Sequence, residues 1–209
     1  MDAPRRIEQT GVRGWLHLPA GTPRAALGVT HGAGSHCEAP LLVAVAEAFV
    51  AAGFAVLRYD LAFRQARPNG PPTGSQARDR ESIRHAATAL RELLPGVPLY
   101  LGGHSYGGRQ TTMLAAEDAD VAQGLLLLSY PLHPPAQPEK LRTEHFPHLR
   151  TPALFAHGTR DEFGTLEEMH AALAGIPAPT ELHSLVGGHG LAAKFAPQIA
   201  EWFVTFTSK

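Results

Sequence analysis

One five-residue stretch constrains the fold of this chain more than any other. Residues 103–107 read Gly-His-Ser-Tyr-Gly; they follow the apolar run 97–101 and precede a helix-like segment over 109–117. This is the context of a nucleophile elbow, in which Ser105 adopts a strained backbone conformation and only small residues two positions away avoid a clash. Taken alone, the motif also fits a Gly-rich turn after a strand. The first interpretation makes Ser105 a candidate nucleophile.

Two later segments supply a candidate acid and a candidate base. Asp161 follows an apolar, strand-like run that ends in a Gly turn, and His189 lies among glycines after a short strand-like segment at 180–185. Singly, each residue more often has a turn, cap or loop role. Their order after Ser105, each behind a predicted strand, is typical of a Ser-Asp-His triad on a parallel sheet. Glu162 is the competing acid, but Asp161 lies closer to the strand end.

The residue types suit nucleophilic catalysis. A serine hydroxyl is a poor nucleophile at neutral pH, so Ser105 needs a base within hydrogen-bonding reach. An imidazole titrates near pH ~6.5, so His189 can take that proton and return it to the leaving group. Asp161 would fix the imidazole tautomer and stabilise the imidazolium without becoming protonated itself.

An early Gly-rich loop supplies a candidate oxyanion hole. The apolar run 25–30 leads into His-Gly-Ala-Gly-Ser at 31–35. Where a strand-turn-helix carries the nucleophile, such a loop provides one backbone N–H and the residue after the nucleophile provides the other. We predict the amides of Ala33 and Tyr106 as donors, with Gly34 as the alternative to Ala33. Without the triad, an ordinary Gly-rich turn would be the better interpretation.

Length and composition limit the classes of protein that fit. The 209 residues predict a single domain over 1–209, and 44% hydrophobic content supports a substantial core. A formal net charge of -1 without a long basic run argues against nucleic-acid binding. No apolar window of ~18 residues predicts a membrane span, and no apolar stretch follows the N-terminal arginines as in a signal peptide. The single cysteine, Cys37, favours a reducing, cytoplasmic location, and we expect it to be a small buried residue rather than a nucleophile.

Twelve histidines raise the question of a metal centre. His145 and His148 are three apart, which is a weak ligand pattern, and no Cys-x-x-Cys or familiar His pair occurs in a suitable setting. We expect neither a metal nor another cofactor. The expected partner is a small-molecule ester or thioester, and the oligomeric state stays open.

Strand-like and helix-like segments alternate along the chain. Predicted strands cover 12–18, 25–30, 54–59, 97–101, 125–129, 180–185 and an apolar run from 154; predicted helices cover 41–52, 75–94, 109–117, 165–174 and 192–206. The Leu-rich run 125–129 is too apolar for a solvent-facing strand and predicts a central parallel one. This alternation predicts an α/β fold with a mostly parallel sheet, helices on both faces and ligands at the carboxyl ends of the strands. The Pro- and Gly-rich stretch 66–74 predicts a mobile loop.

Only residues 130–150 separate the Leu-rich strand from the next one, which is too short for a separate cap domain. We therefore expect a fairly open cleft suited to small or exposed acyl groups. Arg109 and the run 141–144 could recognise a substrate carboxylate or tie loops together, and a structural ion pair is the commoner role. Arg58 and Asp60, near the expected rim, have the same two interpretations.

These motifs resemble the α/β-hydrolase superfamily over nearly the whole chain. The closest resemblance is to a small hydrolase-like family that contains a chromatin-associated NSL-complex subunit and many uncharacterised bacterial proteins. It is carried by the segments 30–34, 103–109, 130–135, 138–145 and 158–164. The resemblance implies Ser105, Asp161 and His189 as catalytic residues and identifies no substrate. Dienelactone hydrolases are more distantly similar, but they carry a cysteine nucleophile where this chain has Ser105.

The resulting prediction is a serine hydrolase that cleaves a carboxylic ester or thioester through an acyl-serine intermediate. A non-catalytic binding or scaffold domain that keeps the fold is the first alternative. Acyl transfer or peptide hydrolysis by the same triad is the second.

Overall fold

A single eight-stranded sheet forms the centre of the molecule. The computed structural model describes residues 3–9 and 11–209, and its strand order is β1-β2-β4-β3-β5-β6-β7-β8. The strands are β1 Arg5–Gln9, β2 Val12–His17, β3 Ala25–Thr30, β4 Phe54–Tyr59, β5 Leu99–His104, β6 Gly124–Leu128, β7 Ala153–Gly158 and β8 Thr180–Leu185. The β1–β2 and β2–β4 pairings are antiparallel, whereas the pairings among β3 to β8 are parallel.

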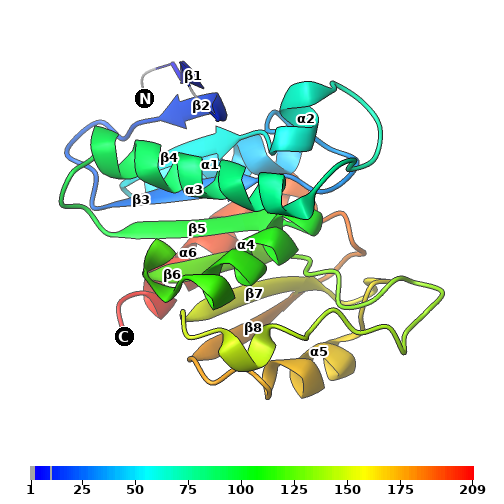
Figure 1. The fold of residues 1–209 in the computed structure, drawn as a ribbon. Helices are drawn as coiled ribbons and strands as arrows, with labels where there is room; N and C mark the ends of the chain where they lie inside the picture. The colour runs from blue at the N-terminus through cyan, green and yellow to red at the C-terminus, as the bar shows by residue number, and fades with distance from the viewer. Residues whose placement is uncertain (1–2, 10) are drawn as a thin grey trace.

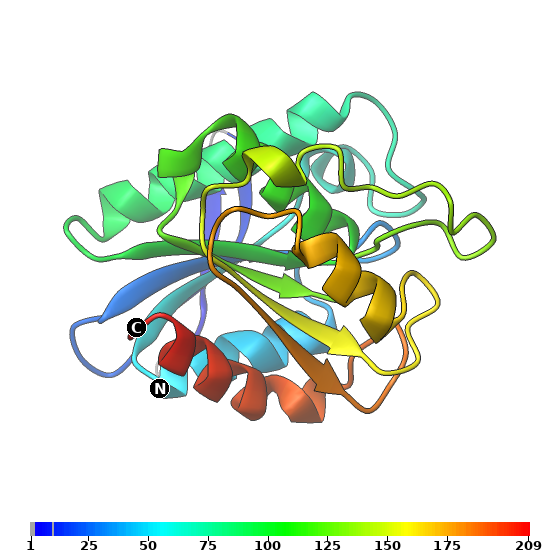
Figure 2. The ribbon, with the colours of Figure 1, turned by 90° about the horizontal axis from the view of Figure 1, so that it is seen from below.

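Helices cover both faces of this sheet (Figures 1 and 2). One face carries α1 Pro40–Ala51 and α6 Ala196–Phe206, and the other carries α3 Gln76–Leu93, α4 Tyr106–Glu117 and α5 Leu166–Leu173. Short turns complete the list: α2 Ala62–Ala66, η1 Ala119–Val121, η2 Phe146–His148 and η3 Ala193–Phe195. The two faces bury two apolar clusters, because the parallel strands are hydrophobic on both sides.

Local sequence signals explain several element boundaries. α1 ends where Gly53 takes a φ of 86°, a left-handed conformation that glycine adopts at little cost. Ser75 caps the N-terminus of α3, because its side chain accepts a hydrogen bond from the Ala77 amide at 3.2 Å. At the start of α5, Thr165 and Glu168 form a reciprocal capping box.

The predicted α/β sheet is confirmed, with differences at the ends of elements. β6 is buried along its whole length and lies between β5 and β7, as its leucines predicted. β1 and α2 were not predicted: β1 is a charged edge strand in which only Ile7 is buried, and α2 has just five residues. α4 begins at Tyr106 instead of 109, because the chain enters the helix directly after the turn at Ser105.

The described residues include no cap domain between β6 and β7. Within the described chain, the connection between β6 and β7 contains η2 as its only helical turn. The loops that follow the parallel strands therefore gather uncovered at one side of the sheet, on the right in Figure 1.

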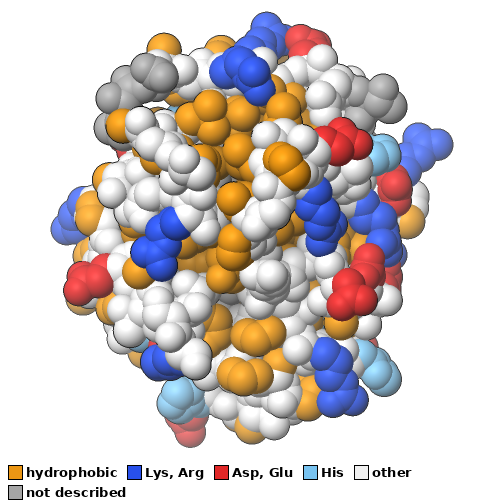
Figure 3. Space-filling view, turned by 90° about the vertical axis from the view of Figure 1, so that its left-hand side faces the viewer, with side chains coloured by type: hydrophobic (Ala, Val, Ile, Leu, Met, Phe, Trp, Pro, Cys, Tyr) orange, Lys and Arg blue, Asp and Glu red, His pale blue; other side chains and the backbone are white. Residues whose placement is uncertain are grey.

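The face at the opposite ends of the strands is shown in Figure 3, where hydrophobic side chains gather in the middle and Lys and Arg side chains lie around them. Among the described residues, no helix combines the length and hydropathy needed to cross a bilayer.

Candidate active site

The turn between β5 and α4 has the strained geometry of a nucleophile elbow. Ser105 has φ 51° and ψ -117°, a conformation that non-glycine residues rarely adopt. A Cβ on Gly103 would lie 2.7 Å from the carbonyl carbon of Gly107, and one on Gly107 would lie 2.5 Å from the backbone oxygen of His31. Only glycine fits at either position, so the two glycines let the backbone turn sharply and leave Ser105 at the head of α4.

Ser105, His189 and Asp161 lie in one hydrogen-bonded chain, although 84 and 28 residues separate the successive partners. His189 Nε2 is 2.7 Å from Ser105 Oγ. His189 Nδ1 is 2.9 Å from both carboxylate oxygens of Asp161. The structure therefore brings together the three residues that the sequence singled out. With Nδ1 donating to the carboxylate, Nε2 is left as the acceptor for the serine hydroxyl.

Asp161 is the better placed of the two neighbouring acids. It is buried, whereas Glu162 is exposed. Burial by itself would raise the pKa of Asp161, but hydrogen bonds from His189 and from the Phe163 amide outweigh it and hold that pKa below its usual range. The acid facing His189 is thus kept as a carboxylate.

Three residues around His189 were not singled out from the sequence. The ring of Phe163 lies against the His189 ring, with 4.1 Å between centroids. His104 Nε2 donates to the His189 backbone oxygen at 3.0 Å, which ties the loop after β8 to the elbow. His157 lies behind Asp161, with its Nε2 3.6 Å from Oδ2, and burial lowers its pKa. The sequence contained signals that could have indicated them: His104 directly precedes Ser105, and His157 and Phe163 lie within four residues of Asp161 in the chain.

The loop after β3 is fixed next to Ser105 by buried polar groups. His31 Nδ1 is 2.9 Å from the Gly32 oxygen, and its Nε2 accepts from the Leu61 amide at 3.2 Å. Burial lowers the pKa of His31 to about 4, so its ring stays neutral. A Cβ on Gly32 would approach Ser105 Cβ to 3.4 Å, which shows how closely this loop packs on the elbow. Ala33, whose amide is the predicted oxyanion donor, follows Gly32 directly in the chain.

Arg58 and Asp60 have structural roles. Asp60 accepts the Cys37 amide at 2.8 Å and pairs with Arg13 at 2.9 Å. Arg58 donates to His17 Nε2 at 2.9 Å and to the Cys37 carbonyl oxygen. Cys37 itself is buried, and burial together with the Asp60 charge raises its thiol pKa to about 12. Such a thiol is a poor nucleophile at neutral pH.

A cavity of about 580 Å³ opens beside Ser105. Its walls include Ala33, Tyr106 and the rings of Phe163 and His189. Arg109 and Arg142 line it as well, and no Asp or Glu of the described chain does. The volume falls within the usual range for small-molecule sites.

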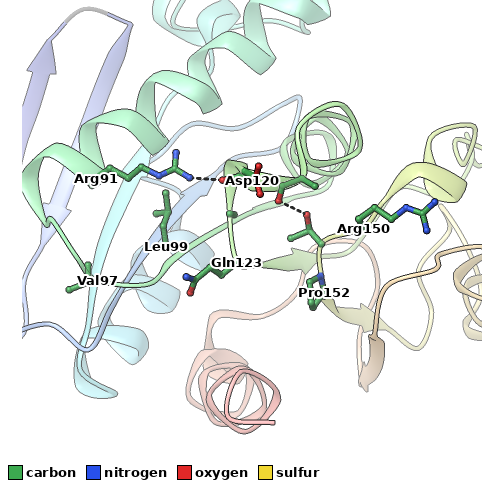
Figure 4. A pocket seen from close by; sticks show the side chains of 10 residues that line it. Arg91, Val97, Leu99, Asp120, Gln123, Arg150 and Pro152 are labelled. Atoms are coloured by element: carbon green, nitrogen blue, oxygen red, sulfur yellow. Dashed lines mark hydrogen bonds between the residues drawn. The ribbon is translucent and has the colours of Figure 1, made fainter.

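A second cavity, of about 480 Å³, lies at the other end of the sheet (Figure 4). It is formed at the amino ends of β5, β6 and β7, and in Figure 4 Arg91 donates to the Asp120 backbone oxygen at 2.8 Å. Ligands of parallel sheets bind at the carboxyl ends of the strands, where Ser105 lies. This second cavity is therefore not the candidate active site.

The two histidines considered for a metal lie apart from Ser105's hydrogen-bonded chain. His145 Nε2 is 2.8 Å from Thr112 Oγ1, and burial lowers the His145 pKa to about 4, while His148 is exposed. Within the described chain, no group of three or more His, Cys, Asp or Glu side chains has a metal-binding arrangement.

Comparison with known proteins identifies the class. A family model described as an alpha/beta hydrolase domain matches residues 23–197, so the chain belongs to that family. Mouse monoglyceride lipase is 32% identical over 113 residues, which is 53% of this chain but only 36% of the lipase. The chain therefore matches about a third of that relative's length.

Solved structures share the fold at low sequence identity. Est1E from Butyrivibrio proteoclasticus matches over 100% of both chains with a TM-score of 0.79 and 19% identity. A dienelactone hydrolase from Anabaena variabilis matches over 97% of this chain and 98% of its own, with a TM-score of 0.75 and 21% identity. At this identity the likeness concerns the architecture alone.

Proposed function

We propose that this protein is a serine hydrolase that cleaves a carboxylic ester or thioester through an acyl-serine intermediate. The observation that carries the proposal is the continuous hydrogen-bonded chain from Ser105 through His189 to Asp161. A turn as strained as that at Ser105 has a cost of order 1–3 kcal/mol, and such strain clusters at functional sites. Membership of the alpha/beta hydrolase family and the partial match to monoglyceride lipase favour the same chemistry.

The proposed reaction begins with Ser105 Oγ attacking the carbonyl carbon while His189 Nε2 takes the hydroxyl proton. The resulting oxyanion is held by the amides of Tyr106, at the start of α4, and of Ala33. Residues at the first turn of a helix have no intrahelical acceptor for their N–H groups, so the Tyr106 amide is available for this role. The N-terminal end of α4 also favours negative charge.

Collapse of the tetrahedral intermediate expels the alcohol or thiol, which receives the proton from the His189 imidazolium. Water then attacks the acyl-Ser105 ester with His189 as base, and the acid product leaves. Asp161 stabilises the imidazolium in both halves of the reaction. Since no cap covers the site in the described chain, we propose a small or exposed acyl group as the substrate.

A fluorophosphonate probe tests the nucleophile directly. We expect stoichiometric labelling of the wild-type protein, none of Ser105→Ala, and undiminished labelling of Ser184→Ala, whose serine is exposed on the edge strand β8. Hydrolysis of short p-nitrophenyl esters and of acyl-thioesters then separates the two substrate classes. An unlabelled wild-type protein that turns over neither class would instead support a scaffold domain, which is the competing function.

A further inference from the structure

Two arginines from different elements line the cavity beside Ser105. Arg109 lies one turn after Ser105 in α4, and its amide donates to the Ser105 backbone oxygen at 3.0 Å. Long helical side chains lean toward the helix N-terminus, which directs Arg109 back toward the serine. Arg142 comes from the connection between β6 and β7 and lines the same cavity.

Neither arginine forms an ion pair with a carboxylate of the described chain. In the described part of the chain, no carboxylate lies within 4.0 Å of either guanidinium, whereas Arg13 and Arg80 form ion pairs with Asp60 and Glu117. The Nε of Arg109 is buried without any hydrogen-bond partner. A buried donor of a charged group that lacks a partner is costly, so the protein does not offset the Arg109 charge at this atom.

The segment that carries Arg142 is held in place. The Arg142 amide donates to the Leu132 oxygen at 2.8 Å, and the Arg142 oxygen accepts from the Tyr130 hydroxyl at 2.6 Å. Its Nη1 donates to the Pro131 oxygen at 3.2 Å, which leaves other N–H groups free. Burial lowers the pKa of Arg142, and the positive charge of Arg109 lowers it further, whereas Tyr130 and the Glu144 carboxylate act in the opposite direction.

We propose that Arg109 and Arg142 form an anion subsite, and that the natural substrate is an ester or thioester carrying a carboxylate or phosphate group. This inference rests on the proposed function, because the subsite adjoins Ser105. Guanidinium groups bind both anions through paired, charge-assisted hydrogen bonds, which would hold the scissile carbonyl at the nucleophile. The ion-pair role that the sequence favoured for Arg109 is not found among the described residues.

Matched esters test the subsite through kcat/KM. Two sets of esters are compared. In the first, the charge is on the alcohol side: 4-acetoxybenzoate and 4-acetoxyphenyl phosphate are anionic, and 4-acetoxybenzamide is neutral. In the second, the charge is on the acyl side: 4-nitrophenyl hydrogen adipate is anionic, and 4-nitrophenyl hexanoate is neutral. We expect at least a tenfold preference for one charged ester over its neutral partner. Arg109→Gln and Arg142→Gln should each reduce that ratio about tenfold or more. Arg150→Gln, at an exposed arginine of the opposite cavity, should keep the wild-type ratio.

Binding to Ser105→Ala protein gives a readout that does not need turnover. Calorimetric titration should show the preferred charged ester binding at least tenfold more tightly than its neutral partner, and the two Arg→Gln changes should remove that difference. Equal affinity for charged and neutral esters would overturn the anion subsite. Fluorophosphonate labelling and turnover of neutral esters would then still support the hydrolase. Conversely, a protein that bound the charged ester but was never labelled would keep the subsite and lose the proposed function.

Discussion

At the scale of single residues, the turn at Ser105 is possible because the neighbouring glycines have no Cβ. Gly103 faces the backbone of Gly107 and Gly108 so closely that a Cβ would lie 2.7 and 2.8 Å from their atoms. These neighbours are main chain of the elbow and the helix start, so they cannot rotate away as a side chain would. Relief requires the Ser105 turn itself to move.

We expect Gly103→Ala to destabilise the fold by about 2–4 kcal/mol, in the range of other overpacked or strained sites, and to lower hydrolysis by displacing Ser105. Urea unfolding and ester turnover measure the two effects. Gly21→Ala is the matched control: a Cβ at Gly21 would have no atom within 4 Å, and its φ is not left-handed, so the stability should stay within ~0.5 kcal/mol of wild type. Equal stabilities for the two variants would contradict the steric account of the elbow.

At the scale of elements, one buried arginine joins two of the loops around the cavity. Arg64, in α2, donates to the backbone oxygens of Ser35 at 2.7 Å and Ala33 at 3.1 Å on the loop after β3. It also donates to the oxygens of Gly70 at 3.0 Å and Arg67 at 3.3 Å on the loop that precedes α3. The candidate oxyanion loop therefore depends on a side chain from a different element.

Arg64→Met should loosen both loops, because four backbone acceptors lose their donor at once. We expect proteinase K, which cuts after many residue types, to cleave within residues 66–74 at least tenfold faster than in wild type, and kcat for ester hydrolysis to fall about tenfold with less change in KM. Mass spectrometry of the first fragments identifies the site.

Arg150→Met, which removes an exposed arginine from the opposite side, should leave the rate of proteinase K cleavage within residues 66–74 unchanged. Unaltered proteolysis and kcat in Arg64→Met would show that the loops hold their shape without this bridge. The mobility predicted for residues 66–74 stays a prediction until that measurement is made.

At the scale of the whole molecule, buried neutral histidines link stability to pH. Burial, with Arg58 adding to the effect, lowers the pKa of His17 to about 4, and burial likewise lowers the pKa of His31 to about 4. In the unfolded chain both titrate near pH ~6.5. Below that pH the two histidines are protonated in the unfolded state but remain neutral in the folded state, so protonation favours unfolding.

The free energy of unfolding should therefore be largest above pH ~6.5 and fall as the pH drops toward ~4, by up to about 1.4 kcal/mol per pH unit for each buried histidine. Urea titrations at several pH values measure this slope. His17→Gln should reduce the slope of unfolding free energy against pH by the contribution of about one proton. His170→Gln, at an exposed position, should not change this slope. A stability that is flat or rises between pH 6.5 and 4.5 would contradict this linkage.

Local patterns predicted much of the fold. The strands β3, β4 and β8 begin and end at the residues predicted for them, and β6 is as central as its leucines indicate. β1 was missed because an exposed edge strand needs no apolar alternation and is stabilised mainly by pairing with β2.

The sequence by itself determined the order of elements, the elbow and the identity of Ser105, Asp161 and His189 as candidates, because chain order and local stereochemistry carry that information. Only the tertiary structure decided which side chains meet. In that structure Phe163 packs on the His189 ring, and Arg58 and Asp60 hold the scaffold together through hydrogen bonds. Arg109 and Arg142 line the cavity and form no ion pair with an acidic side chain of the described residues. Such outcomes depend on distances between segments far apart in the chain, and these distances are set by how the sheet, helices and loops pack together.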